Sequence, residues 1–226
     1  MPPIEIDRRR LFAAGAVTAA AAIAEAAVAQ APAAAFAPKP LAFDPKAVPG
    51  LSEKLLVSHH DNNYAGAVRR LGQIQGQLGG LDAAAPGFQL TGLKREELLA
   101  WNSMVLHEIY FAQFGRPNRP GAALAQAIER DFGSDARWRS EFTALGKAMG
   151  GGSGWALLTW SPHDGKLANQ WAADHTMTLA DGQPLLALDM YEHAYAMDYG
   201  AAAGAYVDAF MKAITWSEAN RRFAAP

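Results

Sequence analysis

The sequence stretch that decides the fold is LLALDMYEHAY, residues 185–195. An apolar run at residues 185–188 ends at a carboxylate, Asp189, and His193 follows four residues later with Glu192 beside it. The run predicts a buried strand, and an oxygen ligand with an imidazole at its exit can bind a transition metal. The alternative is a buried aspartate and histidine that bond only to each other, since such pairs also occur in structural networks. The positions of the other histidines bear on this choice.

The composition limits the ligand types available to a metal site. The chain has 226 residues, half of them hydrophobic, which is enough for a sizeable core in one domain or two small ones. It has no cysteine, so thiolate ligands are excluded and any metal site must use histidines and carboxylates. The net charge is -2 with scattered lysines and arginines, so we expect no nucleic-acid partner.

Residues 1–29 have the pattern of a targeting peptide. An arginine pair in DRRRLF, residues 7–12, precedes an uncharged alanine-rich stretch at 13–24, and Ala27-Val28-Ala29 is a small-x-small cleavage site. The stretch is too short to span a membrane, so we expect no stable membrane anchor. With the arginine pair, it is similar to twin-arginine export signals, and an ordinary secretory signal or a disordered tail is the alternative. We expect export to the periplasm or beyond.

Two long helices are predicted for the first half of the remaining chain. Residues 30–48, rich in alanine and proline, are expected to form a flexible lead-in. Ser52 is a suitable N-cap, and apolar residues recur at helical spacing over residues 55–78. A second helix is expected to begin near Thr91 and to end near Phe114. Their short connection predicts an antiparallel helical hairpin, in a domain of residues 49–116.

A turn cluster, GRPNRPG at residues 115–121, marks the predicted domain boundary. Beyond it, the patterns predict two helices, then three strands, then a mostly helical end, in a C-terminal α/β domain of residues 121–226. The expected helices are 122–132, 136–149 and 191–216 with a break near 200–204, and the expected strands are 155–160, 166–171 and 185–188. The predicted fold class is therefore α+β, a long antiparallel helical hairpin followed by an α/β domain with a small three-stranded antiparallel sheet.

Two histidines lie mid-helix in the predicted hairpin, His59 in the first helix and His107 in the second. Each alone is more often a core histidine with satisfied hydrogen bonds than a ligand. Together with Asp189 and His193, they form a set of three histidines and one aspartate, which suits Mn or Fe as well as Zn. His163 lies in a turn, where we expect it to be exposed.

The order and context of these residues resemble the iron/manganese superoxide dismutase family over about residues 51–216. DMYEHAY at 189–195 is similar to the family's D-x-W-E-H-A-Y signature, GGSGWALL at 151–158 to its glycine-rich strand, and LHEIYF at 106–111 to its N-H-x-x-[YF]-W segment. The resemblance implies a metal between the two domains, one Mn or Fe ion per subunit, and superoxide as the substrate. The implied metal ligands are His59, His107, Asp189 and His193.

The resemblance also implies roles for residues around the metal. His175 falls at or within one residue of the outer-sphere group that hydrogen-bonds solvent at the metal, and a surface loop histidine is the alternative. Trp155 would form an apolar wall, and Phe111 and Tyr191 stand where the family usually has tryptophan. Glu192 matches a glutamate that bonds across the dimer interface to the ligand histidine of the other subunit, so a homodimer is implied.

Several family positions are altered in this chain. The missing groups are a second-shell histidine, a gateway tyrosine, the second tyrosine of H-A-Y-Y and an arginine, replaced by Asn63, Ala67, Ala196 and Gly200. In the family the first three form one hydrogen-bonded cluster, so their joint loss predicts a remodelled proton supply. Tyr64, our second catalytic candidate beside His175, or His60 could partly compensate. A register that matches His60 and Tyr64 to the gateway pair is rejected, because it places Leu56 at a ligand position.

Three functions are compatible with this pattern. The leading one is an exported superoxide dismutase that cycles one Mn or Fe ion between +3 and +2. The second is a catalytically weak or inactive metal-binding member of the same fold with a binding or structural role. The third is a metal-dependent hydrolase, which ranks last because no separate general base stands out. The ligand set suits Mn and Fe alike.

Overall fold

The computed structural model describes residues 37–224, so the predicted targeting peptide lies outside the described residues. The described part begins with a segment that packs on the core through Leu41, Phe43 and Val48. A short 3-10 helix, η2 (Pro45–Ala47), is capped by the carboxylate of Asp44. These contacts correct the expectation of a flexible lead-in for residues 37–48, because its few apolar side chains find partners in the core.

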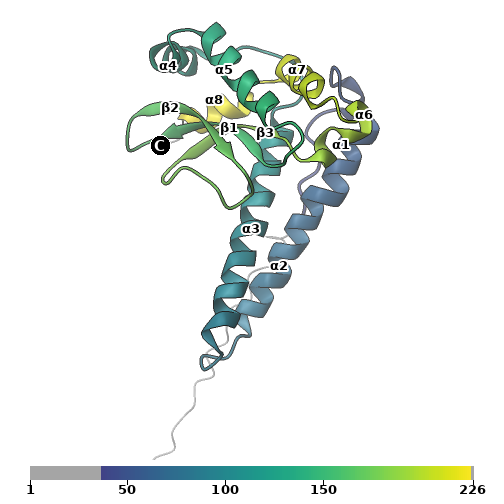
Figure 1. Ribbon diagram of the computed structural model, residues 1–226, viewed down its shortest axis with the longest axis vertical. Coiled ribbons are helices and arrows are strands. Elements are labelled where there is room, and N and C mark those ends of the chain that lie inside the picture. The colour runs from purple at the N-terminus through teal and green to yellow at the C-terminus, as the bar shows by residue number, and fades with distance from the viewer. Residues whose placement is uncertain (1–36, 225–226) are drawn as a thin grey trace, which may run out of the picture. The chain divides into compact units, whose positions relative to one another are not determined.

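The predicted hairpin is present, but its first helix is interrupted. It consists of α1 (Glu53–Ser58), a π-helical turn η3 (His59–Tyr64), and α2 (Ala65–Gly79), and the second helix is α3 (Gly87–Ala112). Ser52 caps α1 by accepting a hydrogen bond from Leu55 N, as predicted. In Figure 1, α2 and α3 run side by side.

Two details of the hairpin differ from the sequence prediction. The helix expected to be continuous over residues 55–78 contains the π-helical turn, which adds one residue locally and leaves the apolar periodicity on either side intact. The second helix begins at Gly87, directly after Pro86, rather than near Thr91. Pro86 has extended backbone angles and ends the preceding loop there.

The C-terminal half is built on a three-stranded antiparallel sheet, as predicted. After α4 (Ala122–Phe132) and α5 (Asp135–Ala148) come β1 (Trp155–Ser161), β2 (Lys166–Ala172) and β3 (Gln183–Asp189), in the order β2-β1-β3. Trp155 pairs with Asp189 across the β1–β3 ladder. In Figure 1, α5 lies over the sheet, and Gly146 allows this approach, since a Cβ there would lie 2.7 Å from Leu188 Cδ2.

The chain after β3 is less helical than the sequence predicts. It forms a 3-10 turn η4 (Glu192–Ala194), α6 (Ala196–Tyr199), α7 (Ala203–Ala213) and α8 (Ser217–Ala224). The expected break near residues 200–204 is confirmed, because Gly200 ends α6 with a φ of 54°. The sequence pattern does not predict α8. Between residues 37 and 224, no helix is both long and apolar enough to cross a bilayer.

A buried glutamine at the end of α3 joins the hairpin to the sheet. The Gln113 amide donates to Ala187 O at 2.7 Å and accepts from Ala187 N at 2.9 Å. Because β3 is an edge strand, the glutamine satisfies backbone groups that no neighbouring strand reaches. It thereby fixes α3, which carries His107, against the strand that ends at Asp189.

Candidate metal centre

Four side chains from four elements converge between the hairpin and the sheet. His59 begins η3, His107 lies in α3, Asp189 ends β3, and His193 lies in η4. One ligand atom from each lies within 4.8 Å of the others. The first three side chains are buried, and that of His193 is 27% exposed. The structure therefore brings together all four residues that the sequence nominated as ligands.

One carboxylate oxygen lies at the focus of this group. Asp189 Oδ2 is 3.2 Å from Nε2 of His59, 3.2 Å from Nε2 of His193 and 3.6 Å from Nε2 of His107. The other oxygen, Oδ1, accepts a hydrogen bond from the backbone N–H of Tyr191 at 2.8 Å. The backbone thus orients the carboxylate and leaves one oxygen facing the three imidazoles.

The hydrogen bonds of the imidazoles test whether a cation fits here. His107 Nδ1 donates to the carbonyl oxygen of Ser103 at 2.6 Å, which leaves a lone pair on Nε2. That Nε2 atom, and both ring nitrogens of His59, are buried without a hydrogen-bond partner. Buried polar atoms without partners are costly, and a cation among the four side chains would satisfy Nε2 of both rings. The donor set fits a metal ion.

Burial and charge put His59, His107 and Asp189 in their ligating forms. Burial lowers the pKa of His59, and it lowers the pKa of His107 to about 3, so both rings are neutral near pH 7. Burial would raise the pKa of Asp189, but the imidazoles of His193 and His59 hold it well below its usual range. The group therefore presents imidazole nitrogens and one ionised carboxylate, donors that suit iron and manganese.

A further histidine lies beside this group. Trp155 Nε1 donates to His175 Nδ1 at 2.9 Å, so in the neutral ring the proton lies on Nε2. The His175 ring stacks on Tyr191 with centroids 4.9 Å apart, and its centroid is 6.2 Å from that of His107. His175 thus belongs to the surroundings of the ligand group, and the alternative of a surface loop histidine does not hold.

Known proteins are similar to this chain over most of its length. Residues 120–222 match the iron/manganese superoxide dismutases, C-terminal domain. The chain is 63% identical to "Superoxide dismutase [Fe]" of Cupriavidus metallidurans, over 83% of this chain and 95% of that protein. It is 34% identical to "Superoxide dismutase [Mn] 1" of Halobacterium salinarum, over 81% of this chain and 92% of that protein. The chain belongs to the iron/manganese superoxide dismutase family. The family and the fold class that the sequence predicted are confirmed.

Aromatic rings surround the ligand group of this superoxide dismutase. Trp155 is fully buried, and its ring centroid lies 5.2 Å from that of His107. The ring centroid of Phe111 lies 5.1 Å from that of His59. Tyr191 stacks on His193 at 5.4 Å. Tyr110, which its sequence pattern marks only as an apolar position, is also part of this wall, with its ring centroid 4.9 Å from that of His59. The one sequence feature that could have indicated this role is a tyrosine on the apolar face of the helix that carries His107.

The hydroxyl of Tyr64 is engaged by other residues. It donates to Glu108 Oε1 at 3.1 Å and accepts from the backbone N–H of Lys39 at 2.9 Å. His60 Nε2 donates to the carbonyl oxygen of Lys39 at 2.8 Å. Lys39 and Glu108 were not nominated from the sequence, because a charged pair 69 positions apart leaves no local pattern.

The remaining residues that the sequence singled out, apart from Ala67, lie at or near the surface. Glu192 is exposed, Asn63 is half-buried, and the side chain of His163 is 83% exposed, as its turn predicts. Ala67 is buried, whereas Ala196 and Gly200 are exposed.

Proposed function

We propose that this superoxide dismutase holds one iron or manganese ion per subunit between His59, His107, Asp189 and His193. Its activity as a member of the family is the conversion of superoxide to oxygen and hydrogen peroxide. The observation that carries the ligand assignment is the convergence of three Nε2 atoms on Asp189 Oδ2. The name of the relative with 63% identity specifies iron, and this favours iron over manganese.

When bound, the ion would supply one-electron chemistry between its +3 and +2 states, for the oxidation of one superoxide to oxygen and the reduction of the next to hydrogen peroxide. Asp189 contributes the single negative charge among the four ligands and thereby favours the higher oxidation state. Burial of His59, His107 and Asp189 keeps bulk water away from three of the four ligands. Trp155 and Phe111 extend this exclusion, since their rings face the imidazoles.

Reduction of superoxide to hydrogen peroxide consumes two protons, so groups that hold protons near the ligands matter. Burial lowers the pKa of His175, which keeps the ring neutral near pH 7, and Trp155 fixes the tautomer that carries the proton on Nε2. Burial raises the pKa of Tyr191 to about 12, so its hydroxyl keeps its proton. We assign His175 the outer-sphere role and Tyr191 the task of holding the His175 ring by stacking.

A second candidate function is a catalytically weak member that binds the ion without efficient turnover. The family's proton relay depends on side-chain groups that are absent here, because their positions hold Asn63, Ala67 and Ala196. The hydroxyl of Tyr64, our candidate to compensate, is shared between Glu108 and Lys39. These observations concern the rate of turnover and leave the ligand assignment unchanged.

We also infer export and a homodimer. The arginine pair and alanine-rich stretch within residues 1–29 support a twin-arginine route to the periplasm, with no stable membrane anchor. For the dimer, the support is that Glu192 is exposed beside His193, the one proposed ligand that reaches the surface. A second copy could therefore approach the centre at this edge.

The test is metal analysis of the protein from its native source together with a superoxide-decay assay. We expect about one iron per chain and rapid decay. Asp189→Asn keeps the bond from Tyr191 N but removes the charge, and it should lower metal content and activity at least tenfold. Asp208→Asn, an exposed aspartate paired with Lys147, is the control. Bound zinc would overturn the proposal, and a bound redox metal with negligible turnover would establish the second candidate.

A further inference from the structure

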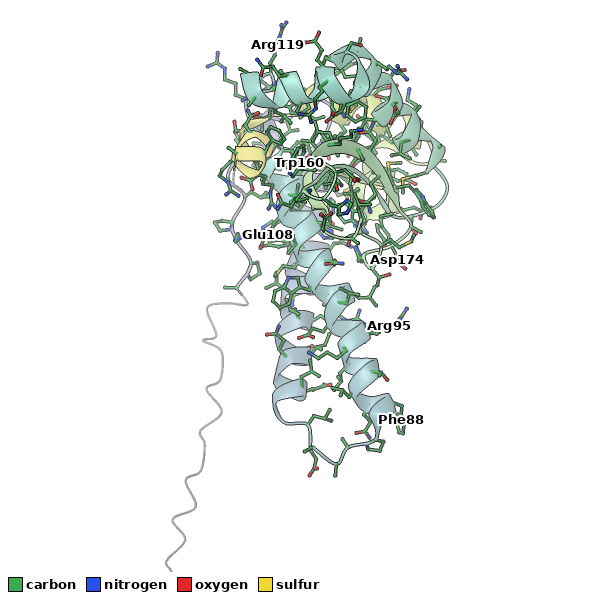
Figure 2. All side chains as sticks on the ribbon, turned by 90° about the vertical axis from the view of Figure 1, so that its left-hand side faces the viewer. Phe88, Arg95, Glu108, Arg119, Trp160 and Asp174 are labelled. Atoms are coloured by element: carbon green, nitrogen blue, oxygen red, sulfur yellow. The ribbon has the colours of Figure 1, made fainter. Side chains whose placement is uncertain are left out.

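Lys39 lies in the segment before the hairpin, and three of its atoms make polar contacts with the hairpin. Its N–H donates to the Tyr64 hydroxyl at 2.9 Å, its carbonyl accepts from His60 Nε2 at 2.8 Å, and its Nζ lies 2.5 Å from Glu108 Oε2. Two of these partners belong to η3 and the third to α3. In Figure 2, Glu108 lies on the side of α3 along which the segment from Ala37 runs.

The turn η3 that Lys39 binds begins at His59. This ligand differs from His107, whose Nδ1 donates to Ser103 O, because no hydrogen bond holds either of its ring nitrogens. Metal-ligating histidines almost always have such a bond, which fixes the ring. The orientation of His59 therefore depends on its backbone in η3 and on the rings around it.

Phe111 connects the Lys39 contacts to His59. Its ring centroid is 5.1 Å from that of His59, 5.4 Å from that of His60 and 6.1 Å from that of Tyr64. Two of the residues that bind Lys39 thus pack on the same ring as His59. A π-helical turn has poorer backbone geometry than an α-helix, so contacts from outside the helix contribute to keeping it in place.

We infer that Lys39 is a positioning residue of the metal centre, because it ties η3 to α3 and so holds His59 in the orientation that faces Asp189. The inference rests on the proposed function, since the orientation of His59 matters only if it ligates the ion. The backbone of Lys39 acts on Tyr64 and His60, and the side chain acts on Glu108. Loss of either set loosens the turn that carries His59.

The test compares metal release and folding stability in variants of the full chain. Lys39→Ala removes the ion pair, Tyr64→Phe removes both bonds of the hydroxyl, and Lys39→Arg restores a cation. Lys46→Ala is a matched control from the same segment, because the side chains of Lys39 and Lys46 are both 70% exposed. The readouts are the rate of iron release to a chelator and the denaturant midpoint of each metal-free variant.

We expect Lys39→Ala and Tyr64→Phe to release iron about tenfold faster than the wild type, with metal-free midpoints close to that of Lys46→Ala. Lys39→Arg should restore release to within about twofold of the wild-type rate. Wild-type release rates in both Lys39→Ala and Tyr64→Phe, or faster release that only follows lost metal-free stability, would overturn the inference. A wild-type chain that retains neither iron nor manganese would instead overturn the proposed function.

Discussion

The side chains of the metal centre are each held by a different kind of contact. Asp189 is oriented by the backbone N–H of Tyr191, His107 by the carbonyl of Ser103, and His175 by the indole of Trp155. The ring nitrogens of His59 have no hydrogen bond, and this side chain is held by its backbone in η3 and by packing. A substitution in the surroundings should therefore affect the one ligand or outer-sphere residue that it supports.

Trp155→Phe should separate the polar role of this residue from its apolar one. Phenylalanine keeps a ring beside His107 but removes the N–H that donates to His175 Nδ1, so the tautomer and orientation of His175 are no longer fixed. We expect turnover per bound metal to fall about 10- to 100-fold, measured by superoxide decay and normalised to metal content.

Trp171→Phe is the matched control, because that indole is 52% exposed on β2. His175→Gln should retain more activity than Trp155→Phe, since an amide oxygen can still accept from the indole while the amide N–H₂ donates. Unchanged turnover per metal in Trp155→Phe would remove His175 from the outer-sphere role.

Among the elements, the regular helices and strands could be predicted from the sequence, and the local irregularities could not. The three strands and α4 and α5 follow from apolar patterns bounded by turn residues. The π-helical turn could not be found this way, because one inserted residue leaves the periodicity of α1 and α2 unchanged on either side. The helix α8 could not be predicted because three of its eight residues are charged and only Ala219 is buried, which leaves no apolar face to recognise.

The site divides in the same way. Asp189 and His193 could be found because they lie four residues apart at the end of one apolar stretch. The histidines of the hairpin could be found because each interrupts the apolar face of a predicted helix. The contacts that hold the site, such as Gln113 on Ala187 and Lys39 on Glu108, join residues 74 and 69 positions apart. Nothing local in the sequence marks such pairs, because each member is an ordinary polar residue in its own segment.

Gln113→Leu tests how α3 is joined to the sheet. Leucine fills a similar volume but leaves the N–H and carbonyl of Ala187 without the partners that the amide provides in this buried place. Each unsatisfied buried group costs about 1–3 kcal/mol, so we expect unfolding free energy to fall by about 3 kcal/mol. Urea unfolding of the metal-free protein measures this.

The same change at an exposed position of the hairpin should be nearly neutral. Gln77→Leu in α2 is the control, with an expected effect within about 0.5 kcal/mol. Equal urea midpoints for Gln113→Leu and the wild type would show that the amide on Ala187 does not stabilise the junction.

In the described part of the chain, the metal centre lies where α3, η3, β3 and η4 meet, and of its four ligands His193 alone is partly exposed. All four ligands have partners or packing within the subunit, but the His193 side chain is still 27% exposed, so the subunit alone does not fully cover it. The proposed homodimer would supply this completion through Glu192 of a second copy. In that proposed dimer, assembly and metal retention would be interdependent.

Glu192→Ala should therefore weaken both the dimer and the hold on the metal. A charge-assisted bond truncated on one side at an interface typically costs about 2–5 kcal/mol, and a twofold dimer would lose two such bonds. We expect the dimer dissociation constant from sedimentation equilibrium to rise more than tenfold, with faster iron release at low protein concentration. Glu129→Ala, an exposed glutamate on α4, should behave as the wild type. A Glu192→Ala variant with wild-type dissociation and release would place the interface on another surface of the subunit.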